Sequence, residues 1–294
     1  MLSKYARKFQ DILCGESLRG VKISTENENA VLLSAGSLQK VTWITLHDEN
    51  LTDMGADDNE RRGMLVTVSY ENAEYRAIFL EDMHLSNTNV NNRNDGFHHF
   101  PLLLIKMPVT LRKSFTDYLA TTFDTRISTL FIGDKCLKDC FEKYIADVCS
   151  NEFFDDDDGN TETNLKLDNI VKDIVVRIGF DLPNGSGSLR AIDIQIPSED
   201  LPKMISMGDT AGHVQIFEAI ETFLSAHLAL DLKNSKVRVK RISCAAFSLD
   251  AEGKLKFMQS SKLDEISTQI RANRKLINSL IKAATSSIML NLNH

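Results

Sequence analysis

Residues 100–132 read FPLLLIKMPVTLRKSFTDYLATTFDTRISTLFI, and the fold class can be argued from this segment. Its first part, 100–105, is a continuous apolar run of strand length, which predicts a strand buried on both faces. Pro108 then stands where proline is favoured, in the first turn of a helix whose apolar residues recur on one stripe. Residues 127–132 return to a strand pattern. A strand, a helix and another strand in succession predict a mixed α/β chain.

The same periodicities predict the elements on either side of this segment. Helices are expected over 2–13, 134–149, 214–228 and 263–289, and strands over 41–46, 64–70, 75–80, 170–180, 189–196, 237–249 and 255–258. The predicted fold class is therefore α/β (mixed α+β), with antiparallel or mixed sheets packed against helices in two lobes.

A boundary between the lobes is predicted where six acidic residues fall within 151–164. A segment this charged and this poor in apolar groups cannot join a core. We therefore expect an N-terminal α/β lobe over 1–150, an acidic linker or loop over 151–164, and a C-terminal α/β lobe over 165–294. The C-terminal lobe would hold the basic strands and a long terminal helix.

Composition excludes several classes of protein. Apolar residues make up 43% of the chain, which is enough to fill a core and argues against global disorder. No apolar run approaches the roughly 18 residues that a membrane span needs, so no membrane association is expected. The five cysteines are scattered and odd in number, which favours reduced thiols in the cytosol or nucleus over a disulfide framework.

Motifs for catalysis or cofactor binding are missing from the sequence. The glycine patterns of phosphate loops are absent, and the acidic run fails the spacing of a calcium loop. Cys136 and Cys140 stand one helical turn apart, but buried thiols are a better interpretation of them than a metal site. We therefore expect no catalytic residue, no metal, no cofactor and no small-molecule substrate, although an enzyme with dispersed catalytic residues stays open.

The charge is divided unevenly along the chain. Residues 233–294 carry 12 Lys and Arg against 4 Asp and Glu, a net +8, whereas residues 1–232 carry a net −15. This asymmetry predicts a localised basic surface on an acidic body. Few aromatic residues interleave with the cations, which favours contacts to the backbone of duplex DNA over single-strand stacking. The candidate DNA-binding residues are Lys236, Arg238, Lys240, Arg241, Lys254, Lys256, Arg271 and Lys275. The alternative is an ordinary solvated face, because edge strands often carry lysine.

The predicted strand 237–249 has 13 residues, which is long where about 5 or 6 is usual. Its middle is apolar on both faces, so both faces need a cover. We expect a partner to supply part of that cover, through an interface formed by Val237, Val239, Ile242, Cys244, Ala246, Phe247 and Leu249. The alternative is that helices of the same lobe cover the strand completely.

The segment 100–132, with Met107-Pro108 before the helix and Phe123 to Arg126 after it, resembles the central part of fungal proteins of the centromere protein L (CENP-L) family. The later order is also similar: the strand 192–196 before helices, the long strand 237–249, and a long terminal helix. The resemblance implies two α/β lobes with a curved antiparallel sheet in the C-terminal lobe.

The resemblance also implies a function. Members of that family are not enzymes, pair with a CENP-N subunit in the inner kinetochore, and line a basic groove near centromeric DNA. For this chain it implies a scaffold subunit in the nucleus, at the centromere, with a CENP-N-like partner, other inner-kinetochore proteins and duplex DNA or a nucleosome. The pairing strand would be 237–249, and the groove would include Lys236, Arg238, Lys240, Lys254 and Lys256. A nuclear nucleic-acid-binding adaptor unrelated to kinetochores is the alternative.

Overall fold

The computed structural model describes residues 2–18, 34–46, 63–81, 99–149, 170–180, 190–200, 204, 216–228, 230–260 and 262–292. The chain divides into two compact units, one of residues 1–128 with 284–294 and one of residues 129–283. The division precedes the helix α5 (Asp134–Cys149), and the predicted acidic linker at 151–164 lies outside the described residues.

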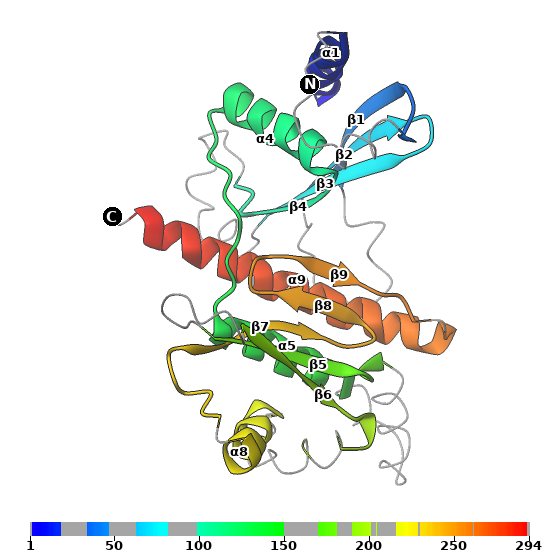
Figure 1. Ribbon diagram of the computed structural model, residues 1–294. Helices are drawn as coiled ribbons and strands as arrows, with labels where there is room; N and C mark the ends of the chain where they lie inside the picture. Colours follow the sequence, from blue (N-terminus) through cyan, green and yellow to red (C-terminus); the bar gives the residue numbers. More distant parts are fainter. Residues whose placement is uncertain are drawn as a thin grey trace, which may run out of the picture. The chain divides into compact units, whose positions relative to one another are not determined.

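The first unit is an antiparallel sheet with two helices packed on one of its faces (Figure 1). The strands run in the order β1 (Leu38–Leu46), β2 (Gly63–Tyr70), β3 (Glu74–Leu80) and β4 (Leu102–Lys106). The helices are α1 (Leu2–Leu18) and α4 (Val109–Phe123). The strands predicted at 41–46, 64–70, 75–80 and 100–105 are confirmed within three residues at their ends, and the helix predicted over 2–13 is confirmed but extends to Leu18.

Aromatic side chains from both helices and the sheet form the core of the first unit. Phe9 of α1 stacks on Tyr118 of α4 with ring centroids 5.0 Å apart, and Trp43 of β1 stacks on Phe79 of β3 at 5.8 Å. The Tyr118 hydroxyl donates a hydrogen bond of 2.9 Å to the carbonyl of Tyr5. These contacts fix α1 and α4 against the same face of the sheet.

The strand predicted at 127–132 is wrong, because these residues have no strand structure. Pro108 does precede α4 as expected, and Asp124 ends that helix in the left-handed conformation. After it the chain runs as an irregular segment whose Phe131 side chain is 75% exposed. An apolar run without a ladder partner gains nothing from the strand conformation.

The second unit contains a five-stranded antiparallel sheet in the order β6-β5-β7-β8-β9 (Figure 1). The strands are β5 (Ile174–Phe180), β6 (Ala191–Ile196), β7 (Val237–Ser243), β8 (Phe247–Asp250) and β9 (Leu255–Phe257). The helices are α5, α8 (Ile216–Leu228) and residues 263–283 of α9 (Leu263–Leu292), with a short 3-10 helix η4 (Ser198–Asp200). The mixed α+β class, with antiparallel sheets packed against helices, is confirmed.

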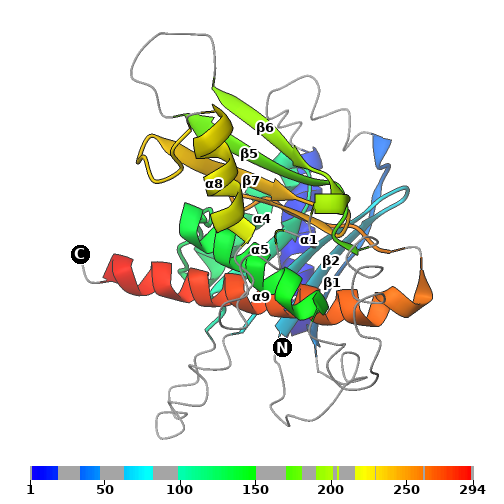
Figure 2. The ribbon, with the colours of Figure 1, turned by 90° about the horizontal axis from the view of Figure 1, so that it is seen from below.

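The helices α5 and α9 cover one face of this sheet, as both Figure 1 and Figure 2 show. The ring of Tyr144 in α5 lies 4.6 Å from that of Phe247 in β8. The Tyr144 hydroxyl donates a hydrogen bond of 3.1 Å to the side-chain oxygen of Asn273 in α9. The helix α5 contacts both the sheet and α9 and belongs to the second unit, whereas the sequence predicted it in the N-terminal lobe.

The single long strand predicted over 237–249 is wrong, because β7 ends at Ser243 and the chain reverses into β8. The Cys244 amide donates to the Phe247 carbonyl at 2.8 Å, which closes the hairpin. The Ala245 amide donates to the carbonyl of Lys172 at 2.8 Å, so the turn is anchored to the chain before β5. The small side chains of Ala245 and Ala246 leave room for this tight reversal.

Candidate functional site

The two faces of the second sheet differ in character because side chains alternate along each strand. The inner face, under α5 and α9, is formed by buried aliphatic side chains. Those of β5 are Ile174, Val176 and Ile178, and those of β7 are Val239 and Ile242. The outer face therefore receives the polar residues between them, and it is the candidate functional site.

A β-bulge in β7 directs two consecutive cations to the outer face. Arg177 of β5 pairs with Arg241, and the next residue, Ile178, pairs with Val239, so Lys240 is the extra residue. This shift keeps Val239 facing inward while Lys240 lies across the outer surface. A Cβ atom on Gly179 would lie 2.6 Å from Cγ of Lys240, so the glycine provides the space for the lysine stem.

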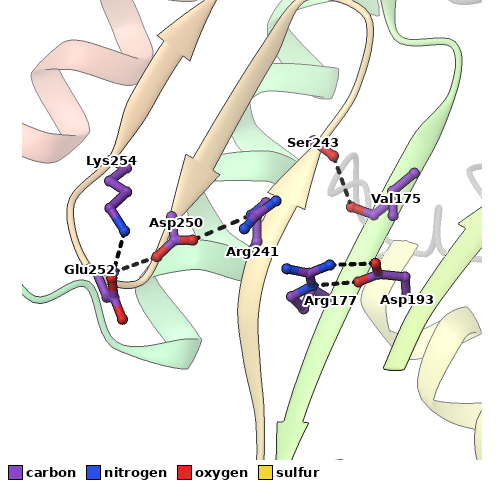
Figure 3. Close-up of polar contacts among 8 residues, drawn as sticks. All are labelled: Val175, Arg177, Asp193, Arg241, Ser243, Asp250, Glu252 and Lys254. Carbon is purple, nitrogen blue, oxygen red and sulfur yellow. Dashed lines mark hydrogen bonds and ion pairs between the residues drawn. The ribbon is translucent and has the colours of Figure 1, made fainter. Parts of the chain in front are cut away.

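A row of four charged side chains crosses the outer face, one from each of β6, β5, β7 and β8 (Figure 3). Nε and Nη2 of Arg177 donate to the two carboxylate oxygens of Asp193, both at 2.6 Å. Nε of Arg241 donates to Oδ2 of Asp250 at 3.3 Å. The hydrogen bond from Arg177 lowers the pKa of Asp193, and the same bond raises the pKa of Arg177.

The two arginines of the row are neighbours, and one acid flanks the pair on each side. The order across the sheet is Asp193, Arg177, Arg241 and Asp250. Like charges directly opposite each other on adjacent strands destabilise a sheet unless they are compensated. Each arginine here has a carboxylate on its far side, so the row is balanced in formal charge. The centre of the outer face is thus less basic than the sequence of β7 alone indicates.

The other predicted DNA-binding residues of this sheet lie around the row. Arg238 is exposed on β7, Lys256 is exposed on β9, and Lys236 is exposed just before β7. Lys254 stands in the β8–β9 turn, where its Nζ donates to Glu252 at 2.8 Å. That hydrogen bond raises the pKa of Lys254. The outer face with its surrounding turns thus carries six of the eight predicted cations.

The two remaining cations, Arg271 and Lys275, lie on α9 and contact α5. Nη2 of Arg271 donates to the backbone carbonyl of Asp147 at 2.8 Å, and Nζ of Lys275 forms an ion pair with the Asp147 carboxylate. Because α5 and α9 cover the inner face of the sheet, the structure does not bring these two residues together with the other six.

Six of the seven predicted interface residues are buried within their own unit. They are Val239, Ile242, Cys244, Ala246, Phe247 and Leu249, and only Val237 is partly exposed. The strand β7 is also paired on both sides, with β5 along its length and with β8 at Arg241–Ser243. The helices of the same unit thus supply the cover that the sequence analysis assigned in part to a partner.

The edges of the second sheet are formed by β6 and β9. The Asp250 amide donates to the Lys254 carbonyl at 3.0 Å, and the Met258 amide donates to the Ala246 carbonyl at 2.8 Å. Backbone groups alternate in direction along an antiparallel strand, so the amides and carbonyls of Leu255 and Phe257 point away from β8. Within the described residues no strand pairs with that side of β9.

Sequence reasoning missed Arg177, Asp193 and the open edge of β9. The signal for the first two was present. Each is a charged residue at an alternate position of a strand whose other positions are mostly aliphatic, as in IVVRIGF and AIDIQI. That pattern indicates a solvent-facing position on a half-buried strand. The open edge depends on where β7 ends, which the sequence did not indicate.

The described residues show no cluster of three or more cysteine, histidine or carboxylate side chains able to hold a metal ion. Each helix in the described ranges is too short or too polar to span a bilayer. A search of curated proteins found no match. The family model "Centromere protein L" matches residues 1–285, which is nearly the whole chain. The chain therefore belongs to the CENP-L family, which makes it a centromere and kinetochore protein of the nucleus.

Proposed function

We propose that this chain is a non-enzymatic scaffold subunit of the inner kinetochore that pairs with a CENP-N-like subunit and presents a basic surface to duplex DNA or a nucleosome. The observation that supports this best is the difference between the two faces of the second sheet. Its inner face is covered by α5 and α9, whereas its outer face is polar and its β9 edge has unpaired backbone groups within the described residues.

The partner would add a strand to the β9 edge. An exposed edge offers main-chain hydrogen bonds to a second chain, and strand addition is a common mode of recognition. The buried side chains of β7 and β8, including Phe247 and Leu249, would stabilise the sheet next to β9 and would not contact the partner. The interface predicted at 237–249 is therefore proposed to lie one strand further along the sheet.

The DNA contacts would come from the margin of the outer face. Lys236, Arg238 and Lys256 are exposed there, and Lys240 lies across Gly179 on the same face. Each phosphate contact made by such a cation releases counterions and adds about 0.9 to the slope of log affinity against log salt concentration. Arg271 and Lys275 are excluded from this surface because they contact Asp147 on the helical side.

Strand addition can be tested with a proline at Leu255. Its amide points away from β8, so proline there removes a donor from the open edge and leaves the ladder within the sheet intact. We expect Leu255→Pro to lose the complex with a co-expressed CENP-N-like subunit while keeping its circular dichroism spectrum. Lys256→Pro is the matched control, because it removes an amide that faces β8 and should destabilise the fold. A folded Leu255→Pro chain that still forms the complex would exclude the β9 edge.

DNA contact can be tested through its salt dependence. The double substitution Arg238→Glu with Lys256→Glu should lower the slope of log affinity against log salt by about 1.8, since two phosphate contacts are lost. Lys275→Ala is the control, and its slope should equal that of the unmodified chain. If the double variant has the same slope as the unmodified chain, the outer face does not contact DNA.

A further inference from the structure

Two cysteines on α5 form a thiol pair that the proposed scaffold function does not use. Sγ of Cys136 lies 4.0 Å from Sγ of Cys140, one turn further along the helix. Cys136 is partly exposed, whereas Cys140 is 2% exposed and lies on the side of α5 that faces the core. One sulfur is thus open to small reagents and the other is held directly behind it.

The two sulfurs differ in their readiness to ionise. The hydrogen bond from the Cys140 thiol stabilises the thiolate of Cys136 and lowers its pKa to about 7, an effect larger than the opposing effect of burial. The same hydrogen bond and burial raise the pKa of Cys140. A partly exposed thiolate is the form of cysteine that reacts with oxidants, whereas a buried protonated thiol is inert until a neighbouring sulfur becomes electrophilic.

We propose that Cys136 and Cys140 form a reversible oxidation site for hydrogen peroxide, with Cys136 as the reacting thiol and Cys140 as the resolving thiol. The Cys136 thiolate attacks one peroxide oxygen, the O–O bond breaks, and with one proton the products are a sulfenic acid and water. The Cys140 sulfur then attacks the Cys136 sulfur, the S–O bond breaks, and the hydroxyl leaves as water with the Cys140 proton. Peroxide is reduced by two electrons and the two thiols are oxidised to one disulfide.

The geometry makes this disulfide strained and hence easily reduced. Cβ atoms four residues apart on a helix are about 5–6 Å apart, whereas a disulfide requires about 3.5–4.5 Å. The helix must therefore contract on one side between Cys136 and Cys140 when the bond forms. Strained disulfides have higher reduction potentials than structural ones, so cellular thiols reverse them. The site would stay reduced in the nucleus and respond only to an oxidant.

Contraction of α5 at this point would act on the contacts that its first turns make. Oδ1 of Asp134 accepts the Val239 amide of β7 at 2.6 Å, and Nζ of Lys138 donates to Glu221 of α8 at 3.1 Å. Both anchors lie within one turn of Cys136. Oxidation should therefore loosen the attachment of β7 and α8 to α5 and lower the unfolding midpoint of the oxidised chain relative to the reduced chain.

Peptide mapping of the whole chain tests the proposal directly. Trypsin cleaves after Lys135, Lys138 and Lys143, so the two cysteines fall in separate peptides, CLK and DCFEK. After treatment with hydrogen peroxide and digestion without reductant, we expect these two peptides joined, with a loss of two hydrogens that dithiothreitol reverses. A chain in which peroxide oxidises the other cysteines first, or leaves CLK and DCFEK unjoined, would overturn the proposal.

Single substitutions separate the two roles. Cys140→Ser should abolish the joined peptide and leave a sulfenic acid on Cys136 that dimedone traps. Cys136→Ser should show neither product, and Cys14→Ser, which changes an exposed thiol on α1, should behave as the unmodified chain. Because Cys140 is buried, Cys140→Ala serves as a second variant, and circular dichroism checks that each chain is folded. Dimedone labelling of Cys140 in Cys136→Ser would refute the assignment of roles.

Discussion

The buried position of Phe247 leads to a prediction that separates a core residue from an interface residue. Its side chain is 1% exposed, and its ring lies 4.6 Å from Tyr144 and 6.2 Å from Phe141, both on α5. Phe247→Ala would remove all of these contacts and leave a cavity between the sheet and the helix. If the side chain instead served a partner, the isolated chain would lose little stability.

The expected cost follows from the size of the deleted group. Truncation of a buried phenylalanine costs about 3–5 kcal/mol. Two aromatic neighbours lose their partner at the same time, so we expect the middle of that range, about 4 kcal/mol. With an m value of about 2 kcal/mol per molar urea, the midpoint of unfolding should fall by about 2 M.

Urea unfolding followed by far-ultraviolet circular dichroism measures this change. The single tryptophan, Trp43, lies in the first unit, so its fluorescence provides a second probe for the part of the chain that the substitution does not touch. Phe131→Ala is the matched control, because that ring is 75% exposed and its loss should change stability by less than about 0.5 kcal/mol. Equal midpoints for Phe247→Ala and Phe131→Ala would refute the assignment of Phe247 to the core.

Three further predictions follow from single contacts in the second unit. Burial raises the pKa of Glu142, whose carboxylate accepts a hydrogen bond from the Phe217 amide. Ionisation of this carboxyl therefore costs stability as the pH rises above the ordinary pKa of a glutamate side chain, so Glu142→Gln should stabilise the chain more, relative to the parent, at neutral pH than near pH 4. Gln269→Ala deprives two backbone groups after β9 of their hydrogen-bond partner and should cost about 1–3 kcal/mol, with faster amide exchange there. Gly253 has a φ of 76°, and an added Cβ would lie 2.5 Å from the Leu130 carbonyl, so Gly253→Ala should lower the melting temperature.

Elements with strong local signals could be predicted from the sequence. The helix α4 begins directly after Pro108, and α5 has its apolar residues at helical spacing, so both were expected close to their observed bounds. The strands β2 and β3 alternate buried and less buried positions around a short polar turn. In each case the residues that set the structure are neighbours along the chain, which is the condition under which periodicity is informative.

Features set by distant contacts could not be predicted. The turn between β7 and β8 has Ala245 and Ala246 where a hairpin usually shows glycine, asparagine or proline, and it is anchored by the carbonyl of Lys172. The membership of α5 in the second unit depends on Tyr144 meeting Phe247, about a hundred residues later. For the candidate site, the exposed cations on β7 and β9 could be predicted, but Asp193 and Asp250, which pair with Arg177 and Arg241, lie on other strands than these arginines.

The two proposed activities of the second sheet are physically connected. A strand added to β9 would continue the sheet, and its outward side chains would lie beside Lys256, which occupies the outer face of that edge strand. The partner would thus extend the surface that meets DNA phosphates, away from the balanced row at Arg177 and Arg241. We therefore expect Leu255→Pro to weaken both pairing and DNA binding of the complex, and Lys256→Glu to weaken DNA binding alone. Loss of pairing in a folded Lys256→Glu chain would contradict this connection.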